Sequence, residues 1–261
     1  MEIRFLNRRQ GSRKLRIAFL GFSFHTDLVL QLYPELLNSN LVQRSKDFDV
    51  AMVDFYSAIR HLSNPGEAEK ISISVNKIFD DYDEVCVYAH SFGVYAAGLF
   101  FSPKLNFCST ETKNKIHTAF AYSGTLNPIN DEQGIPLRVF SLTRRDFNDR
   151  TLQNFRQRCG VEMPFCDETS ECRQCGNKKD IQMFAEDLEL AEQVYLHHGN
   201  PGFRYDYALV AMNDKIFPPR NQVAAWQTCA ETILQNCNHF EALSLMLGNL
   251  TSQNLHTLQN E

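Results

Sequence analysis

The stretch YAHSFGVYAAG, residues 88–98, decides the fold predicted for this chain. The residues before it, EVCVY at 84–88, are mostly β-branched or aromatic and predict a buried strand. The small residues after it favour a helix that packs closely on that strand. Ala89 and Gly93 leave room for a tight turn, and Ser91 stands at its tip. A strand-to-helix turn written small-x-Ser-x-Gly is typical of a nucleophile elbow.

Length and composition describe an ordinary globular protein. The chain has 261 residues, of which 43% are hydrophobic and 22% charged, which is enough to bury a full core. Its net charge of -5 argues against general binding of nucleic acid. The basic N-terminus lacks a following apolar segment, and no apolar run is long enough to span a bilayer. We therefore expect a cytoplasmic protein with no nucleic-acid or membrane partner.

Predicted strands alternate with predicted helices along most of the chain. Residues 1–8 and 14–20 are expected to pair as a hairpin. Further strands are predicted at 51–55, 84–89, 117–122, 207–212 and 233–237, and helices at 27–37, 67–79 and 221–230. This alternation predicts an α/β fold with a mostly parallel sheet and helices on both faces.

The alternation is lost in the middle of the chain, where only one long helix, at 180–195, is clearly predicted. We therefore expect a core made of residues 1–124 and 203–261. Residues 125–202 are expected to form a helical lid inserted into it.

A serine nucleophile needs a base, and the base needs a carboxylate to orient it. In α/β-hydrolases the acid precedes the histidine, and each follows a late strand. Asp214 follows the strand at 207–212, and His239 opens a loop after the last strand, so both fit. Taken singly, Ser91 could be a helix cap, Asp214 a turn residue and His239 a surface residue. Their order and spacing together favour a catalytic triad, and His90 is expected to point away from the elbow tip.

The developing oxyanion needs two backbone N–H groups. Phe92, directly after the serine, is expected to give one. Phe22, in the loop after the first core strand, is expected to give the other. Gly21 is expected to allow the unusual backbone shape of that loop.

Eight cysteines are present, and a cytoplasmic chain is not expected to pair them as disulfides. Four lie close together: Cys159, Cys166, Cys172 and Cys175. One Cys-x-x-Cys pair with irregular neighbours is weak evidence for zinc. We therefore expect no metal, and a zinc-binding lid remains an alternative.

Four longer stretches resemble one family: YAHSFGVYAA, SGTLNPINDEQGIP, LQNFRQR and AMNDKIFPPRNQVAAW. They are similar to BioG-type pimeloyl-[acyl-carrier-protein] methyl ester esterases of biotin synthesis. The resemblance implies hydrolysis of that methyl ester, with Ser91 as nucleophile, His239 as base and Asp214 as its orienter, and without a cofactor. Two positions differ from the pattern: His90 stands where tryptophan is common, and the oxyanion loop reads Gly-Phe-Ser where Gly-Trp-Gly is common.

The resemblance also implies an acyl carrier protein as partner, and the expected lid carries a local excess of positive charge. Carrier proteins are small and strongly acidic, so a basic lid would attract one. The expected docking residues are Arg138, Arg144, Arg145, Arg150, Arg156 and Arg158. The alternatives are an esterase or thioesterase for another acyl chain, and a hydrolase-like binding protein without activity.

Overall fold

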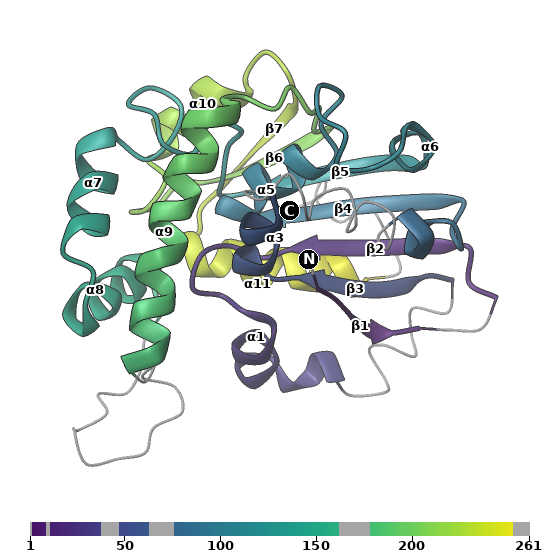
Figure 1. Ribbon diagram of the computed structural model, residues 1–261, viewed down its shortest axis with the longest axis horizontal. Helices are drawn as coiled ribbons and strands as arrows, with labels where there is room; N and C mark the ends of the chain where they lie inside the picture. The colour runs from purple at the N-terminus through teal and green to yellow at the C-terminus, as the bar shows by residue number, and fades with distance from the viewer. Residues whose placement is uncertain (1, 9–10, 38–46, 63–75, 162–177, 253–261) are drawn as a thin grey trace.

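The computed structural model describes residues 2–8, 11–37, 47–62, 76–161 and 178–252. Within these ranges seven strands form one sheet in the order β1-β3-β2-β4-β5-β6-β7 (Figure 1). The strands are β1 (Ile3–Asn7), β2 (Lys14–Phe19), β3 (Asp49–Val53), β4 (Glu84–His90), β5 (Ile116–Tyr122), β6 (Tyr207–Ala211) and β7 (Glu231–Gln235).

Six of these strands run parallel, and β1 is antiparallel to its neighbour β3. The predicted parallel sheet is therefore confirmed, but the predicted hairpin is wrong. β3 lies between β1 and β2 and pairs with both, as Ile3 faces Val53 and Phe19 faces the same residue from the other side. A hairpin requires neighbouring strands, and a short polar connection in the sequence does not reveal that a later strand enters between them.

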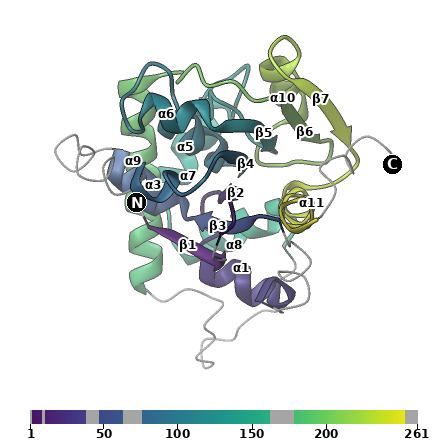
Figure 2. The same ribbon diagram turned by 90° about the vertical axis from the view of Figure 1, so that its right-hand side faces the viewer.

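Helices cover both faces of the sheet (Figure 2). α3 and α5 lie on one face and α11 on the other, where it contacts β2, β4, β5 and β6. The described helices are α1 (Thr26–Leu32), η1 (Pro34–Leu37), α3 (Phe55–Leu62), α5 (Phe92–Phe100), α6 (Thr110–Asn114), α7 (Leu137–Arg145), α8 (Asp149–Cys159), α9 (Lys178–His198), α10 (Pro219–Trp226) and α11 (His239–Thr251).

The elbow strand and helix form the centre of the core. Six of the seven residues of β4 and all nine of α5 are buried. A Cβ atom at Gly93 would lie only 2.3 Å from the backbone oxygen of Phe19 on β2. Glycine is therefore required there, because α5 approaches the sheet more closely than any side chain permits.

Several element boundaries differ from those predicted, and proline explains two of the differences. The helix predicted at 27–37, with a bend expected at Pro34, is broken before that residue into α1 and η1, since proline cannot continue the hydrogen bonding. The helix predicted from 221 begins at Pro219, where proline suits the first turn. β3 begins two residues earlier than predicted, and most of the helix predicted at 67–79 lies outside the described residues.

Among the described residues between β5 and β6, the chain forms three helices, α7, α8 and α9. They stand beyond the end of the sheet at which the parallel strands finish, at the left of Figure 1. The boundaries 125–202 of a lid stay a prediction. In the part of the chain that the structure describes, no helix has the length and apolar character needed to cross a membrane.

Candidate active site

Ser91 occupies the turn between β4 and α5 in a rare backbone conformation. Its φ of 58° and ψ of -131° lie outside the regions that non-glycine residues favour. Its side chain accepts no capping hydrogen bond from α5, which removes the interpretation of Ser91 as a simple helix cap. Strain of this kind concentrates at functional sites. The residue is also nearly covered, with 2% of its surface exposed.

Two glycines allow other loops to approach this serine. A Cβ at Gly21 would lie 2.5 Å from the Cβ of Ser91 and 3.1 Å from its Oγ, and a Cβ at Gly124 would lie 2.2 Å from its carbonyl oxygen. The expected reason for Gly21 is therefore corrected. The positive φ in that loop belongs to Ser23, at 65°, and Gly21 is needed for its close approach to Ser91.

Asp214 lies on the loop after β6 and is 5% exposed. One carboxylate oxygen, Oδ1, accepts from the backbone N–H groups of Ile216 and Phe217 at 2.7 and 3.0 Å. The other, Oδ2, accepts from Nε2 of Gln222 at 3.1 Å and lies 2.8 Å from Nδ1 of His239. Four donors therefore fix this carboxylate, and an ionised carboxylate is an acceptor only.

The bond from Asp214 determines the state of the His239 ring. Nδ1 donates to the carboxylate, so in the neutral ring Nε2 carries the lone pair. This Nε2 atom is buried and has no hydrogen-bond partner among the described residues. The ring of Phe217 lies parallel to it, with an interplanar angle of 4° and a centroid distance of 6.1 Å. The imidazole is thus oriented and has one nitrogen available to accept a proton.

His239 was expected on a loop, and this prediction is wrong, because it is the first residue of α11. Asn238 accepts a hydrogen bond from the N–H of Glu241, and the Glu241 side chain accepts one from the N–H of Asn238. This reciprocal capping box begins the helix. The sequence carries a signal for this helix start, Asn-x-x-Glu at 238–241.

His90 contacts His239, a contact that the sequence does not predict, and the expectation that its ring points away from the elbow tip stays a prediction. Its Nε2 lies 2.9 Å from the backbone oxygen of His239, and the two ring centroids are 4.6 Å apart. Burial, with the neighbouring histidine as a second cause, lowers the pKa of His90 well below its ordinary value.

Phe22 and Phe92 flank the serine, one from the loop after β2 and the other at the start of α5. Among the described residues, neither backbone N–H has a hydrogen-bond acceptor. The first N–H groups of a helix lack partners within it, which accounts for the N–H of Phe92. Both N–H groups are therefore available to a ligand.

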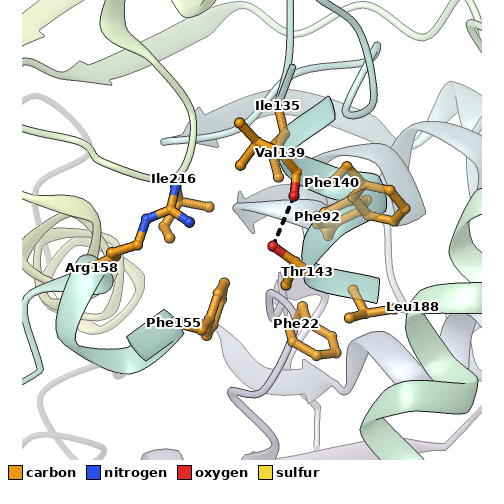
Figure 3. A pocket seen from close by; sticks show the side chains of 10 residues that line it. All are labelled: Phe22, Phe92, Ile135, Val139, Phe140, Thr143, Phe155, Arg158, Leu188 and Ile216. Atoms are coloured by element: carbon orange, nitrogen blue, oxygen red, sulfur yellow. Dashed lines mark hydrogen bonds between the residues drawn. The ribbon is translucent and has the colours of Figure 1, made fainter. Parts of the chain in front are cut away.

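Both phenylalanine rings also line a small, largely apolar pocket that is partly open to solvent. Figure 3 shows these rings together with side chains from α7, α8 and α9. The remaining lining residues are Ile135, Val139, Phe140, Thr143, Phe155, Arg158, Leu188 and Ile216. Thr143 donates its hydroxyl proton to the Val139 carbonyl at 2.9 Å, so the wall that it forms is effectively apolar. Apart from the Arg158 guanidinium, the lining suits an alkyl chain better than a polar ligand.

The ring of Phe22 joins the core to the inserted helices. It makes edge contacts with Phe147, Phe155 and Phe184, at centroid distances of 5.8, 5.3 and 5.6 Å. It makes a fourth with Phe55 on α3, at 6.4 Å. A single side chain beside the serine is thus packed against α8, α9 and the loop before α8.

The six expected docking arginines differ in exposure and in their partners. The prediction of Arg156 as a docking residue is wrong, because this side chain is buried and the residue is only 9% exposed. Arg144 pairs with Glu192 on α9 at 3.0 Å, and Arg158 donates to the backbone oxygen of Lys215 at 2.6 Å. Arg145 pairs with its neighbour Asp146. The other two, Arg138 and Arg150, are exposed and form no ion pair with another described residue.

The cysteine cluster is described only in part. Cys166, Cys172 and Cys175 lie outside the described residues. Cys159 is fully buried on α8, and burial, aided by the nearby Asp214 carboxylate, raises the pKa of its thiol well above the usual value. Within the described ranges no three histidine, cysteine or acidic side chains gather as a metal site would require.

Comparisons with solved structures agree with this architecture. The chain is similar to the crystal structure of BioG from Haemophilus influenzae, with a TM-score of 0.64 and 20% identity over 94% of this chain and 96% of that one. It is also similar to the esterase EaEST from Exiguobacterium antarcticum, with a TM-score of 0.62 and 12% identity over 96% and 95%. The predicted α/β-hydrolase fold is therefore confirmed.

Sequence comparisons point to one family. A curated relative, malonyl-[acyl-carrier protein] O-methyltransferase from Bacteroides fragilis (strain 638R), is 30% identical over 166 residues. The match covers 63% of this chain and 31% of that protein, so the chain spans about a third of the relative's length. The family model for the pimeloyl-ACP methyl esterase BioG matches residues 69–243, a span that begins before the elbow strand and ends beyond His239. The chain therefore belongs to the BioG family of pimeloyl-ACP methyl esterases.

Proposed function

We propose that this protein is a serine hydrolase that cleaves the methyl ester of pimeloyl-[acyl-carrier protein], giving pimeloyl-[acyl-carrier protein] and methanol. The observation that carries the proposal is a strained serine at the turn after β4, together with a buried aspartate–histidine pair in which the carboxylate orients the imidazole. Family membership supports the ester as substrate. The carrier protein as partner also agrees with the name of the B. fragilis relative, whose reaction uses a carrier-linked substrate.

In the proposed mechanism Ser91 Oγ attacks the ester carbonyl while Nε2 of His239 accepts the hydroxyl proton. The Asp214 carboxylate stabilises the imidazolium that forms. The backbone N–H groups of Phe22 and Phe92 donate to the oxyanion. The C–O bond to the methoxy group then breaks, and the imidazolium gives its proton to the leaving methanol. Water, activated by the same histidine, hydrolyses the acyl-serine and restores the enzyme.

The pocket supports an acyl chain as the group next to the scissile ester. Two of the rings that line it belong to the residues whose N–H groups are the proposed oxyanion donors, Phe22 and Phe92. An alkyl chain in this pocket would remain close to Ser91 and out of water, and its burial would supply binding energy at about 25 cal/mol per Å².

For the carrier protein, the proposed docking surface is reduced to the exposed residues Arg138 and Arg150. They begin α7 and α8, on the outer side of the molecule at the left of Figure 1. Arg158 is proposed to act deeper, at the pocket wall, where its guanidinium could meet the phosphate of the carrier's prosthetic arm.

Hydrolysis of methyl pimeloyl-[acyl-carrier protein] tests the function directly. The wild-type protein is expected to release methanol from it, and Ser91→Ala is expected to lose the activity by 10³-fold or more. A fluorophosphonate probe should label the wild type and not Ser91→Ala. Labelling together with turnover of other acyl esters only would favour the alternative esterase, and no labelling of the folded wild type would favour a binding protein.

The docking surface has a separate test. Arg138→Glu with Arg150→Glu is expected to raise KM for the carrier-linked ester at low salt and leave a small soluble ester unaffected. The matched control is Lys77→Glu with Arg204→Glu, which makes the same change in charge at exposed sites before β4 and β6. An equal rise in KM for both double variants would assign the effect to net charge and reject the surface.

A further inference from the structure

His90 is the last residue of β4 and precedes Ser91 directly in the chain. Its ring is fully buried and makes edge contact with Phe24 at a centroid distance of 5.9 Å. On its other side Nε2 lies 2.9 Å from the backbone oxygen of His239. The contact links two segments that are 149 residues apart, one with the proposed nucleophile and the other with the proposed base.

The chemistry of this contact fixes the position of the ring proton. A carbonyl oxygen can only accept, so Nε2 of His90 must carry the hydrogen. The second nitrogen, Nδ1, is buried without a hydrogen-bond partner among the described residues. Protonation at Nδ1 would create an unpaired buried charge beside the ring of His239, which is unfavourable. The ring is therefore neutral and acts as a donor.

The bond from His90 is made to the backbone of the base, whereas other contacts hold its imidazole. The imidazole is held by Asp214 at Nδ1 and by the ring of Phe217 on one side. Its backbone belongs to the first turn of α11, which is fixed from outside the helix by the capping residue Asn238. The bond from His90 connects that turn to the elbow itself.

We propose that His90 is a positioning residue, which holds the backbone of His239 so that Nε2 of the base faces Ser91 Oγ. This inference rests on the proposed function, because it assigns to His90 a part in the same reaction. It predicts that the bond affects the chemical step, and that the substrate is bound equally well without it.

Two substitutions separate the hydrogen bond from the volume of the side chain. His90→Gln keeps an amide N–H donor at a similar reach, and His90→Met keeps a comparable volume without a donor. With a small soluble ester, His90→Met is expected to lower kcat about tenfold, the worth of one hydrogen bond, with KM unchanged. His90→Gln is expected to stay within about threefold of the wild type. The rate of fluorophosphonate labelling should follow the same order.

Thermal unfolding of both variants provides the control for folding, and His90→Leu replaces His90→Met if the latter does not fold. Equal kcat for the donor and non-donor variants, or a change in KM alone, would overturn the proposal. If only His90→Gln folds, the bond serves stability and the proposal is also rejected. Ser91→Ala is measured alongside, since undiminished hydrolysis by that variant would refute the proposed function itself, whatever His90 does.

Discussion

Replacing Gly21 by alanine tests the proposed oxyanion loop most directly. The added Cβ would lie 2.5 Å from the Cβ of Ser91 and 3.1 Å from both its Oγ and the backbone oxygen of His90. Carbon atoms not bonded to each other rest about 3.5–4.0 Å apart, so the two segments must separate by about 1 Å. The turn at Ser91 cannot move away, because it is closely packed on two other sides. Gly93 lies against the backbone of Phe19 on β2, and Gly124 lies against the backbone of Ser91. The loop that carries Phe22 must therefore move.

The size of that movement sets the expected effect. A misplacement of about 1 Å in a group that meets the transition state costs about 100-fold in rate. We therefore expect Gly21→Ala to lower kcat for a small soluble ester about 100-fold. Overpacking of this kind also costs about 1–3 kcal/mol of folding stability, so the variant should still fold.

The assay compares kcat with the free energy of unfolding in urea. The control is Gly248→Ala on α11, where no atom lies within 4 Å of the added Cβ. It should gain about 0.5–1 kcal/mol through helix propensity and keep its kcat. A folded Gly21→Ala protein with kcat within threefold of the wild type would refute the assignment of an oxyanion donor to this loop.

Three further predictions concern buried charged groups. Asp214→Asn should lower kcat at least 100-fold in the ester assay with the fold retained, because an amide favours the wrong tautomer of His239; a loss below tenfold would contradict this role. Burial raises the pKa of Asp187 on α9 to about 6, against the partly opposing Arg60. The Asp187 carboxyl therefore binds a proton more tightly in the folded state than in the unfolded state. The stability that this tighter binding contributes is lost as pH rises from about 4 to 6. In urea titrations the free energy of unfolding of Asp187→Asn, relative to that of the wild type, should thus rise by roughly 2–3 kcal/mol between pH 4 and 7.5. Parallel plots of the free energy of unfolding against pH for the two proteins would reject this. Arg16→Met should cost about 2 kcal/mol in urea unfolding without changing kcat, since the buried guanidinium donates to three backbone carbonyls at the end of α11; unchanged stability would contradict it.

The parts of the fold that the sequence predicted are those with local causes. The strand at 84–89, the turn at Ser91 and the small-residue helix follow from neighbouring residues, and the structure has β4 and α5 there. The hairpin failed because strand pairing is a long-range property, and β3 is more than 30 residues away from β2 in the chain. α7 and α8 were not predicted, because each is mostly polar and buries only a narrow stripe that includes Phe140 or Phe155.

The candidate site was predicted as a set of residues but not as a set of contacts. The order Ser91, Asp214, His239 is visible in the sequence, and the structure joins the last two at 2.8 Å. The need for glycine at 21 and the contact made by His90 both arise from distances across the fold, which no local pattern encodes. The burial of Arg156 follows equally from the way α8 packs, so a count of charges could not separate it from Arg150.

The structure assigns the proposed chemistry and the substrate pocket to different parts of the chain. Ser91, Asp214 and His239 follow β4, β6 and β7, so the sheet fixes their positions. The pocket wall comes largely from α7, α8 and α9, which lie outside the sheet. Phe22 belongs to both parts, since its N–H is a proposed oxyanion donor and its ring packs against the inserted helices. Ser91 itself is almost covered, with 2% of its surface exposed. Because the N–H and the ring of Phe22 belong to one residue, a change in the packing of α8 or α9 around this ring is expected to shift the proposed oxyanion donor as well.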